Sequence, residues 1–423
     1  MHTRSRTRSV AVPRPPQSVA GLLPAEIVDC IFSHFDFDYS IGAPRKDRMD
    51  LTRNFSNMSV IAEGWKGPAR RLLCRTVRIE SWDQLAEGVP EWARGGLQNA
   101  RIQAISWEEA QPHKAASALF KFFQHAPNLR VLRLTYPPVR SFDAGDSTLM
   151  RTTHFLPLLR DLTVDSHRQV PHSVIYDILA TSDRQISRLD LWNDPDAVPP
   201  ITGEPLDFGG NLRYLRVGGG GSECSSLDYL DPVPCSLVGL KEMWLDWIEG
   251  QPSDSMRETF AAVGPTLEKL TIDSGDVTGI VVSFPLLTRL TRLSLPSVPA
   301  SLDSLLLPPS LVSLQFVSDD NLLPLLHRWT ATPSLLPDTL QQINIRVVRD
   351  YQTFERLPRI VKLGTYYTSR LVGLLRHFAP RTLPFKTLEV YFDNYDLDEI
   401  EAVEAECKRL EVIFSRRMED DWD

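Results

Sequence analysis

The chain has 423 residues, of which 42% are hydrophobic and 24% charged, so it has enough apolar side chains to build a large core. Its net charge of −8 argues against a general nucleic-acid-binding protein, since such proteins present a basic surface. The five cysteines are scattered, with no Cys-x-x-Cys pair and no histidine close enough to complete a zinc site: Cys30, Cys74, Cys224, Cys235 and Cys407. We therefore expect reduced thiols, no metal and no cofactor. No apolar run approaches the length of a membrane span, so we expect a cytoplasmic or nuclear protein without a membrane partner.

Residues 1–20 differ in composition from the rest of the chain. They contain no acidic residue, several Ser and Pro, and four arginines: Arg4, Arg6, Arg8 and Arg14. This composition predicts a disordered basic tail, and the tail lacks the apolar segment of a secretory signal. An Arg-rich start is also typical of a mitochondrial transit peptide. However, the prolines between residues 13 and 16 oppose the amphipathic helix that such a peptide forms.

Residues 21–73 carry three short apolar segments at helical spacing. The first contains Leu22, Leu23, Ile27, Ile31 and Phe35, with Pro24 suited to the first helical turn. The second contains Leu51, Phe55, Met58 and Ile61 and ends at Trp65, and "GPARRLL" forms the third. Three helices this short cannot bury all their apolar faces, so we expect some apolar surface to remain for a partner. Alternatively, they only cap the repeats that follow.

A repeat occupies most of the remaining sequence. Nine copies of the pattern L-x-x-L-x-L begin at residues 129, 159, 186, 212, 240, 267, 290, 311 and 340. Looser copies are Cys74-Val77-Ile79, Ile102-Ile105-Trp107 and Phe385-Leu388-Val390. A repeat of 21 to 30 residues with this core is typical of leucine-rich repeats, which contribute one strand each.

The segments between the predicted strands are helix-like, notably 116–129, 173–180, 255–267 and 369–380. The pattern therefore predicts an α/β solenoid over 74–395, with parallel strands on the concave side and helices on the convex side. The Asn or Cys expected at the ninth repeat position is missing, so the array is an irregular one. The run Gly218–Gly221 follows a predicted strand without the helix start and Lys or Ser/Thr partner of a phosphate-binding loop. We therefore interpret it as a flexible loop.

Residues 396–423 are predicted to close the open end of the array. Asp396 and Glu399 resemble a capping box at a helix start. Apolar residues then follow at helical spacing: Leu397, Ile400, Val403, Cys407, Leu410 and Phe414. We expect an amphipathic capping helix followed by an acidic tail, because terminal repeats need a covering element.

The module before the repeats resembles an F-box. The resemblance rests on Leu23-Pro24-x-Glu26-Ile27 with Ile31 and Phe32, and on "NMSVIAEGW" ending at Trp65. It covers roughly residues 21–80, and the repeats behind it match the F-box and leucine-rich-repeat architecture of fungal proteins. The chain departs from the family in its longer 36–50 loop and in the polar residues at 52–54.

The resemblance implies a function without catalysis. F-box proteins are substrate receptors of SCF-type cullin–RING ubiquitin ligases: the F-box docks a Skp-family adaptor, and the second domain captures a target protein. The expected adaptor contacts are Leu23, Pro24, Ile27, Ile31, Phe32 and Trp65. No H-E-x-x-H, G-x-S-x-G or nucleotide loop occurs, so we expect no enzyme. The alternative is a leucine-rich-repeat scaffold without a ubiquitin link, which co-purification with a Skp-family adaptor would separate.

The third, fifth and seventh residues of each copy should point to the concave face. The expected target contacts in the central repeats are Trp192, Tyr214, Arg216, Trp244, Asp246 and Lys269. Arg188, Asp190, Glu242 and Asp273 accompany them. Aromatic anchors among charges of both signs suit a protein segment rather than nucleic acid. Alternatively, loops fold over the tryptophans and bury them.

Overall fold

The computed structural model describes the following residues: 76–79, 85, 96–103, 112–135, 142–166, 172–193, 210–218, 237–248, 254–297, 307–317, 325, 328–329, 332, 335–346, 372, 376, 387–392 and 397–418. The predicted tail, the F-box-like module and its six expected adaptor contacts lie outside these residues. The chain divides into two compact units, one of residues 1–77 and 91–97 and the other of residues 78–90 and 98–423. The description below concerns the second unit and the described residues at its boundary, 76–77 and 96–97.

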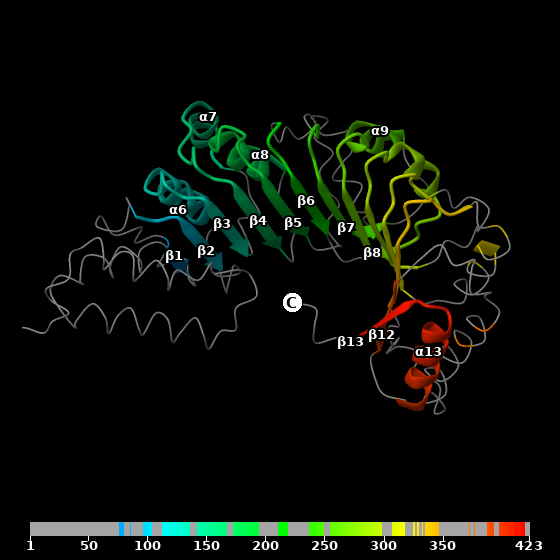
Figure 1. Ribbon diagram of the computed structural model, residues 1–423. Helices are drawn as coiled ribbons and strands as arrows, with labels where there is room; N and C mark the ends of the chain where they lie inside the picture. The colour runs from blue at the N-terminus through cyan, green and yellow to red at the C-terminus, as the bar shows by residue number, and fades with distance from the viewer. Residues whose placement is uncertain are drawn as a thin grey trace, which may run out of the picture. The chain divides into compact units, whose positions relative to one another are not determined.

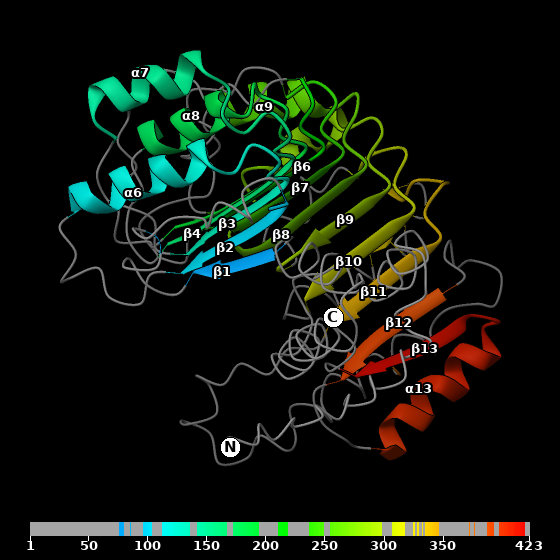
Figure 2. The same ribbon diagram turned by 90° about the vertical axis from the view of Figure 1, so that its left-hand side faces the viewer.

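A single parallel sheet organises this unit. It contains 13 strands among the described residues, and each strand lies beside its neighbours in sequence (Figures 1 and 2). All pairings from β2 to β13 are parallel. This open, sequential order confirms the predicted parallel sheet and is consistent with an α/β solenoid. The strands are β1 (Thr76–Ile79), β2 (Asn99–Gln103), β3 (Val131–Thr135), β4 (Asp161–Ser166), β5 (Arg188–Asn193), β6 (Tyr214–Gly218), β7 (Glu242–Ile248), β8 (Lys269–Gly275), β9 (Arg292–Leu295), β10 (Ser313–Val317), β11 (Gln342–Arg346), β12 (Thr387–Phe392) and β13 (Ile413–Met418).

The repeat pattern explains why these segments form strands. Alternate residues of a strand point to opposite faces, so the fourth and sixth residues of each copy share one face. On β6 these residues are Leu215 and Val217, which are buried, whereas Tyr214 and Arg216 remain partly exposed. Burying a side chain such as Leu215 stabilises the fold by about 1.5–3 kcal/mol. The inward leucines therefore hold the sheet against its helices.

The helices cover the apolar face of the sheet. Four of them lie along one side of it: α6 (Pro112–Gln124), α7 (Ala144–Thr152), α8 (His172–Thr181) and α9 (Asp254–Val263) (Figure 2). Their inner side chains, including Phe122 and Phe123 of α6 and Phe260 of α9, are buried. A 3-10 helix, η3 (Val281–Leu286), takes the helical place in a shorter repeat. No helix within the described ranges is long and apolar enough to cross a membrane.

The start of the sheet differs from the sequence prediction. The copy beginning at Ile102 was wrong, because β2 pairs Ala100 with Leu132 and Ile102 with Leu134. Ile102 therefore occupies the sixth position of a copy that begins at Leu97, which is also buried. The correct register was missed because the small residue Ala100 stands where the other copies have a large apolar one.

The C-terminal end also differs. The helix α13 (Leu397–Arg409) forms as expected, but it does not extend to Phe414. Glu411 adopts a left-handed backbone conformation, with φ of 59°, and the Val412 N–H donates to the Cys407 carbonyl. These features end the helix, and the chain then enters β13, which pairs with β12. The sequence pattern did not predict β13, because Arg416 is in register with Val390 at a position where other copies are apolar.

Candidate functional site

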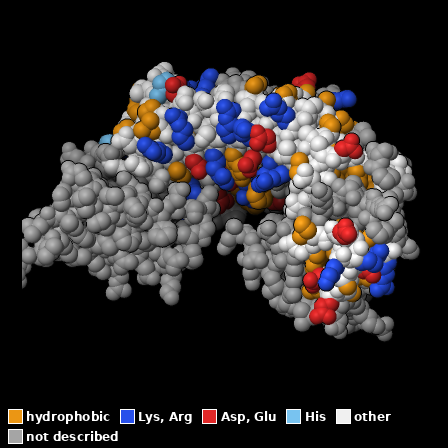
Figure 3. All heavy atoms as spheres, viewed as in Figure 1, with side chains coloured by type: hydrophobic (Ala, Val, Ile, Leu, Met, Phe, Trp, Pro, Cys, Tyr) orange, Lys and Arg blue, Asp and Glu red, His pale blue; other side chains and the backbone are white. Residues whose placement is uncertain are grey.

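The third, fifth and seventh residues of the repeat copies line one face of the sheet, which we call the polar face. Strand register places Arg188, Tyr214, Glu242 and Lys269 side by side on β5 to β8. The fifth residues form a second row of Asp190, Arg216, Trp244 and Thr271. Acidic, basic and hydrophobic side chains are neighbours in the middle of the described surface (Figure 3). The six predicted target contacts all lie on β5 to β8, and all are partly exposed.

Arg216 lies between two tryptophans at the centre of the polar face. Its guanidinium carbon is 4.8 Å from the ring centroid of Trp192 and 4.3 Å from that of Trp244. One of its nitrogens, Nη2, is 3.7 Å from Oδ1 of Asp246. A guanidinium over an aromatic ring contributes about 0.5–2 kcal/mol, depending on how far it is desolvated. Arg216 therefore links side chains from β5, β6 and β7 into one cluster.

Gly218 makes room for one of these tryptophans. It ends β6, in register with Trp192 on β5. A β-carbon at residue 218 would lie 2.8 Å from Cε3 of Trp192 and 3.1 Å from Cβ of Asp246. Gly218 therefore belongs to the strand and to the candidate site, not to the loop that the sequence predicted. A glycine at the seventh repeat position, directly across from Trp192, was the available signal.

A second contact between a guanidinium and an aromatic ring lies on β5 and β6, between Arg188 and Tyr214. The guanidinium carbon of Arg188 is 3.9 Å from the ring centroid of Tyr214, and its Nε is 4.0 Å from Oδ2 of Asp161. On the other side, Nζ of Lys269 is 3.5 Å from Oε2 of Glu242. These contacts join side chains from adjacent strands. The polar face thus carries three neighbouring groups of paired charges and aromatic rings between β4 and β8.

Trp244 also forms a hydrogen bond with the carboxylate of Asp273. Its indole N–H donates a 2.7 Å hydrogen bond to Oδ2 of Asp273 on β8. Asp246 has only 13% of its side chain exposed, and this burial, together with repulsion from Asp273, raises its pKa to about 6. Arg216 lowers the same pKa but does not offset these two effects. Asp246 and Asp273 therefore form a pair of carboxylates that the neighbouring cation neutralises incompletely.

Two further carboxylates are affected in the same way. Burial raises the pKa of Asp161 and of Asp190 above the ordinary value, although nearby arginines act to lower both. Asp190 is 8% exposed. Burial likewise raises the pKa of the Tyr214 hydroxyl. The centre of the polar face therefore contains carboxylates that have lost much of their hydration.

Trp192 and Trp244 are half-buried, and the segments that follow β5, β6 and β7 lie outside the described residues, so the alternative prediction that loops cover the tryptophans stays a prediction. Trp192, Trp244 and Tyr214 each leave part of the ring exposed between charged neighbours. Partly exposed aromatic rings with charged surroundings are typical of the anchors in protein interfaces. The geometry therefore suits contact with another protein.

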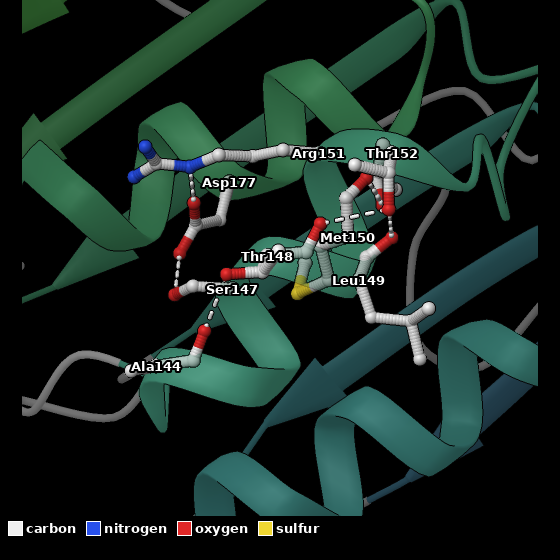
Figure 4. A network of polar contacts seen from close by, with 9 residues as sticks. Ala144, Ser147, Thr148, Leu149, Met150, Arg151, Thr152 and Asp177 are labelled. Carbon is white, nitrogen blue, oxygen red and sulfur yellow. Dashed lines mark hydrogen bonds and ion pairs between the residues drawn. The ribbon is translucent and has the colours of Figure 1, made fainter.

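A second polar cluster lies on α7 and α8, away from the polar face (Figure 4). Asp177 of α8 is fully buried and accepts hydrogen bonds from Ser147 Oγ at 2.5 Å and Arg151 Nε at 2.7 Å. The Arg151 guanidinium also lies 4.7 Å from the ring centroid of Tyr176. Asp177 is thus occupied by partners from α7. This cluster clamps α7 to α8.

The described residues contain no group of three or more His, Cys, Asp or Glu side chains that could hold a metal ion. Cys407, the free thiol of α13, is buried, which raises its pKa to about 11. A thiol with that pKa stays protonated and unreactive near neutral pH.

No family model matches the chain, and no curated protein matches it. Among solved structures, the crystal structure of the Rad7 and Elc1 complex in yeast is similar over 88% of this chain and 89% of that chain. The two sequences are 14% identical, and the TM-score is 0.34.

Proposed function

We propose that the chain is a substrate receptor of an SCF-type cullin–RING ubiquitin ligase. Residues 21–73 dock a Skp-family adaptor as an F-box, through the six contacts named above. An irregular leucine-rich-repeat array over 74–395 captures a target protein on its polar, concave side. The receptor performs no chemistry of its own and needs no cofactor. It works in the cytoplasm or the nucleus.

One observation carries the target-binding part of the proposal: the polar face groups Trp192, Tyr214 and Trp244 with paired charges across neighbouring strands. Interface hot spots are enriched in Trp, Tyr and Arg, the residue types found here. The charged surroundings can fix the register of a bound segment. The adaptor-binding part is supported by the sequence motif from Leu23 to Trp65.

Co-expression with a Skp-family adaptor tests the proposal. The tagged full-length chain should retain the adaptor through affinity purification and gel filtration as a stoichiometric complex. Changing both Leu23→Ala and Pro24→Ala should abolish retention, because these side chains form the predicted docking surface. The matched control changes Val12→Ala and Pro13→Ala, an apolar–proline pair in the predicted tail, and should retain the adaptor.

Trp244→Ala separates the two parts of the receptor. It should leave adaptor retention unchanged, because Trp244 belongs to the target-binding face. Truncating a central aromatic anchor typically weakens capture by about 2 kcal/mol or more. If the Leu23 and Pro24 variant unfolds instead of losing only the adaptor, the residues are a cap for the repeats. If the folded wild-type chain retains no adaptor, the protein is a scaffold without a ubiquitin link.

A further inference from the structure

We propose that the polar face of β5 to β8 binds an extended protein segment through an arginine or lysine side chain, whose cation lies against Asp246 and Asp273 beside Trp244. This inference rests on the proposed function, because it names the kind of target that the receptor would capture. The proposed ligand of the polar face is therefore a basic peptide.

The charges of the polar face favour a cation. On β5 to β8, the strands of the proposed site, the third, fifth and seventh residues include four carboxylates and three cations, an excess of one negative charge. The carboxylates are Asp190, Glu242, Asp246 and Asp273, and the cations are Arg188, Arg216 and Lys269. The excess lies on β7 and β8, which carry three of the carboxylates and one of the cations. A segment with a central basic residue would complement this distribution.

Burial strengthens the effect of the excess negative charge, because buried carboxylates have lost much of their hydration. Asp190 is 8% exposed, and attraction from Arg216 and Arg188 does not offset the effect of this burial, which raises its pKa. Asp161 Oδ1 is buried and has no hydrogen-bond partner. A poorly hydrated carboxylate without a full set of donors is unfavourable. A cation bound at Asp246 and Asp273 would add attraction to these carboxylates at a distance, without contacting the buried oxygen.

Asp246 and Asp273 mark the point of entry. Asp273 is exposed and already oriented by the Trp244 indole N–H at 2.7 Å, and Asp246 interacts with it closely enough that repulsion from Asp273 adds to the effect of burial on the Asp246 pKa. The ring of Trp244 can also accept a cation, as its contact with Arg216 at 4.3 Å demonstrates. Two carboxylates and an aromatic ring are the groups that recognise a guanidinium or ammonium side chain.

The width of the face fits a short extended segment. Crossing from β5 to β8 covers three interstrand spacings, about 14 Å in total. An extended chain spans that distance with about four or five residues. A peptide of nine residues therefore covers the face with margin at both ends.

An acidic or phosphorylated segment fits less well. Arg133, Arg188 and Arg216 each have an Nε that lacks an acceptor, which would favour an anion. These nitrogens are buried, and aromatic rings lie against the guanidinium groups of Arg188 and Arg216, so a ligand does not reach them directly. Asp273 is exposed and repels an anion, and the partly exposed cation Lys269 is already paired with Glu242 at 3.5 Å.

Fluorescence anisotropy with defined peptides tests the inference. The probe is a fluorescein-labelled nine-residue peptide with three arginines separated by single glycines and flanked by serines. Two matched peptides carry glutamine or glutamate in place of arginine. At pH 7.5 and 0.15 M NaCl, the arginine peptide should bind the full-length protein at least about tenfold more tightly than the glutamine peptide. The glutamate peptide should not bind.

The protein variants locate the site. Asp246→Asn combined with Asp273→Asn should weaken binding of the arginine peptide by about tenfold. The matched control changes Glu268→Gln and Glu411→Gln, two exposed acids that lie off the polar face, and should bind as the wild type does. The arginine and glutamine peptides are compared on the wild-type protein. The difference between them therefore does not depend on how the variants fold.

Four outcomes would overturn the inference: no binding by the arginine peptide, equal binding by the glutamine peptide, tighter binding by the glutamate peptide, or equal weakening by the two double variants. The last would mean general attraction to a chain of net charge −8. Adaptor retention, measured on the same preparation, separates this inference from the proposed function. If peptide binding fails while the adaptor is retained, the cation site is excluded and the receptor role is kept. If the adaptor is not retained but the peptide results hold, the cation site is kept and the receptor role is excluded.

Discussion

Gly218 and Trp192 face each other on neighbouring strands so closely that a β-carbon at residue 218 would lie 2.8 Å from the indole ring. The missing side chain lets the ring lie over β6, where it contacts the Arg216 guanidinium. A glycine in a strand usually weakens the strand. Here it allows an aromatic ring to be placed on the face that we propose binds a target.

We expect Gly218→Ala to destabilise the protein. The added methyl group must displace Trp192 or the β-carbon of Asp246, and overpacking of this kind costs about 1–3 kcal/mol. Urea denaturation followed by circular dichroism measures the change. Gly210→Ala is the matched control, because a β-carbon there meets no atom within 4 Å, and it should change stability by less than about 0.5 kcal/mol. Equal effects of the two substitutions would contradict the packing at Gly218.

Asp246 should make stability depend on pH. Its pKa of about 6 lies above the ordinary value of 3.8, so between these values the folded state binds a proton that the unfolded state releases. The free energy of unfolding should therefore fall as pH rises from about 4 to about 6, by about 1–3 kcal/mol. In Asp246→Asn the contribution of this carboxylate disappears. The free energy of unfolding of the variant, relative to that of the wild type, should therefore be higher at pH 7 than at pH 4.5. Urea denaturation at the two pH values measures the difference.

Gly210→Ala supplies the control for this pH dependence, because it removes no titratable group and its β-carbon meets no atom within 4 Å. It should show the wild-type pH dependence. Asp143→Asn, at an exposed residue that precedes α7 and makes no side-chain capping hydrogen bond, is the control for the loss of a carboxylate at a single pH. A pH profile of Asp246→Asn that is parallel to the wild type would show that the carboxylate titrates normally.

The clamp between α7 and α8 should be sensitive to Asp177. In Asp177→Asn the amide oxygen can still accept from Arg151 and the amide N–H can donate to Ser147, but the hydrogen bond from Arg151 is no longer made to a charged group. Hydrogen bonds to charged groups contribute about 1.5–3 kcal/mol against about 1 kcal/mol for neutral ones, so we expect a loss of about 1–2 kcal/mol. Thermal or urea unfolding checks this, again with Asp143→Asn as the near-neutral control. A loss no larger than that of the control would mean that α7 packs independently of the clamp.

Arg216 should depend on its planar shape as well as on its charge. Arg216→Lys keeps the charge but removes the flat group between Trp192 and Trp244, so we expect a loss of about 1 kcal/mol and altered tryptophan fluorescence. Arg213→Lys is the control, since Arg213 is exposed and its contact with the Gly239 carbonyl at 2.7 Å can be made by an ammonium group. Unchanged fluorescence in Arg216→Lys would argue against the stacked arrangement.

The repeat pattern was sufficient to predict which residues of β3 to β10 point inward, because alternation in a strand leaves only two faces. It also placed Trp192, Tyr214 and Trp244 on one face. It could not predict that Arg216 lies between two rings, since that depends on side-chain rotamers and on the space left by Gly218. The helix α7 was missed because its sequence is mostly polar, with Met150 as its buried residue. Its position depends on Asp177 of the next helix, which no local pattern reveals.

The sequential strand order has a consequence for how the polar face is encoded. Each strand pairs only with its predecessor and its successor, so the residues of β5 to β8 come from the single stretch 188–275 and from nowhere else in the chain. Recombination or duplication that moves this stretch as one cassette would carry the whole face with it. Binding specificity in such an array is therefore modular: it can be inherited, exchanged or grafted as one contiguous piece of gene.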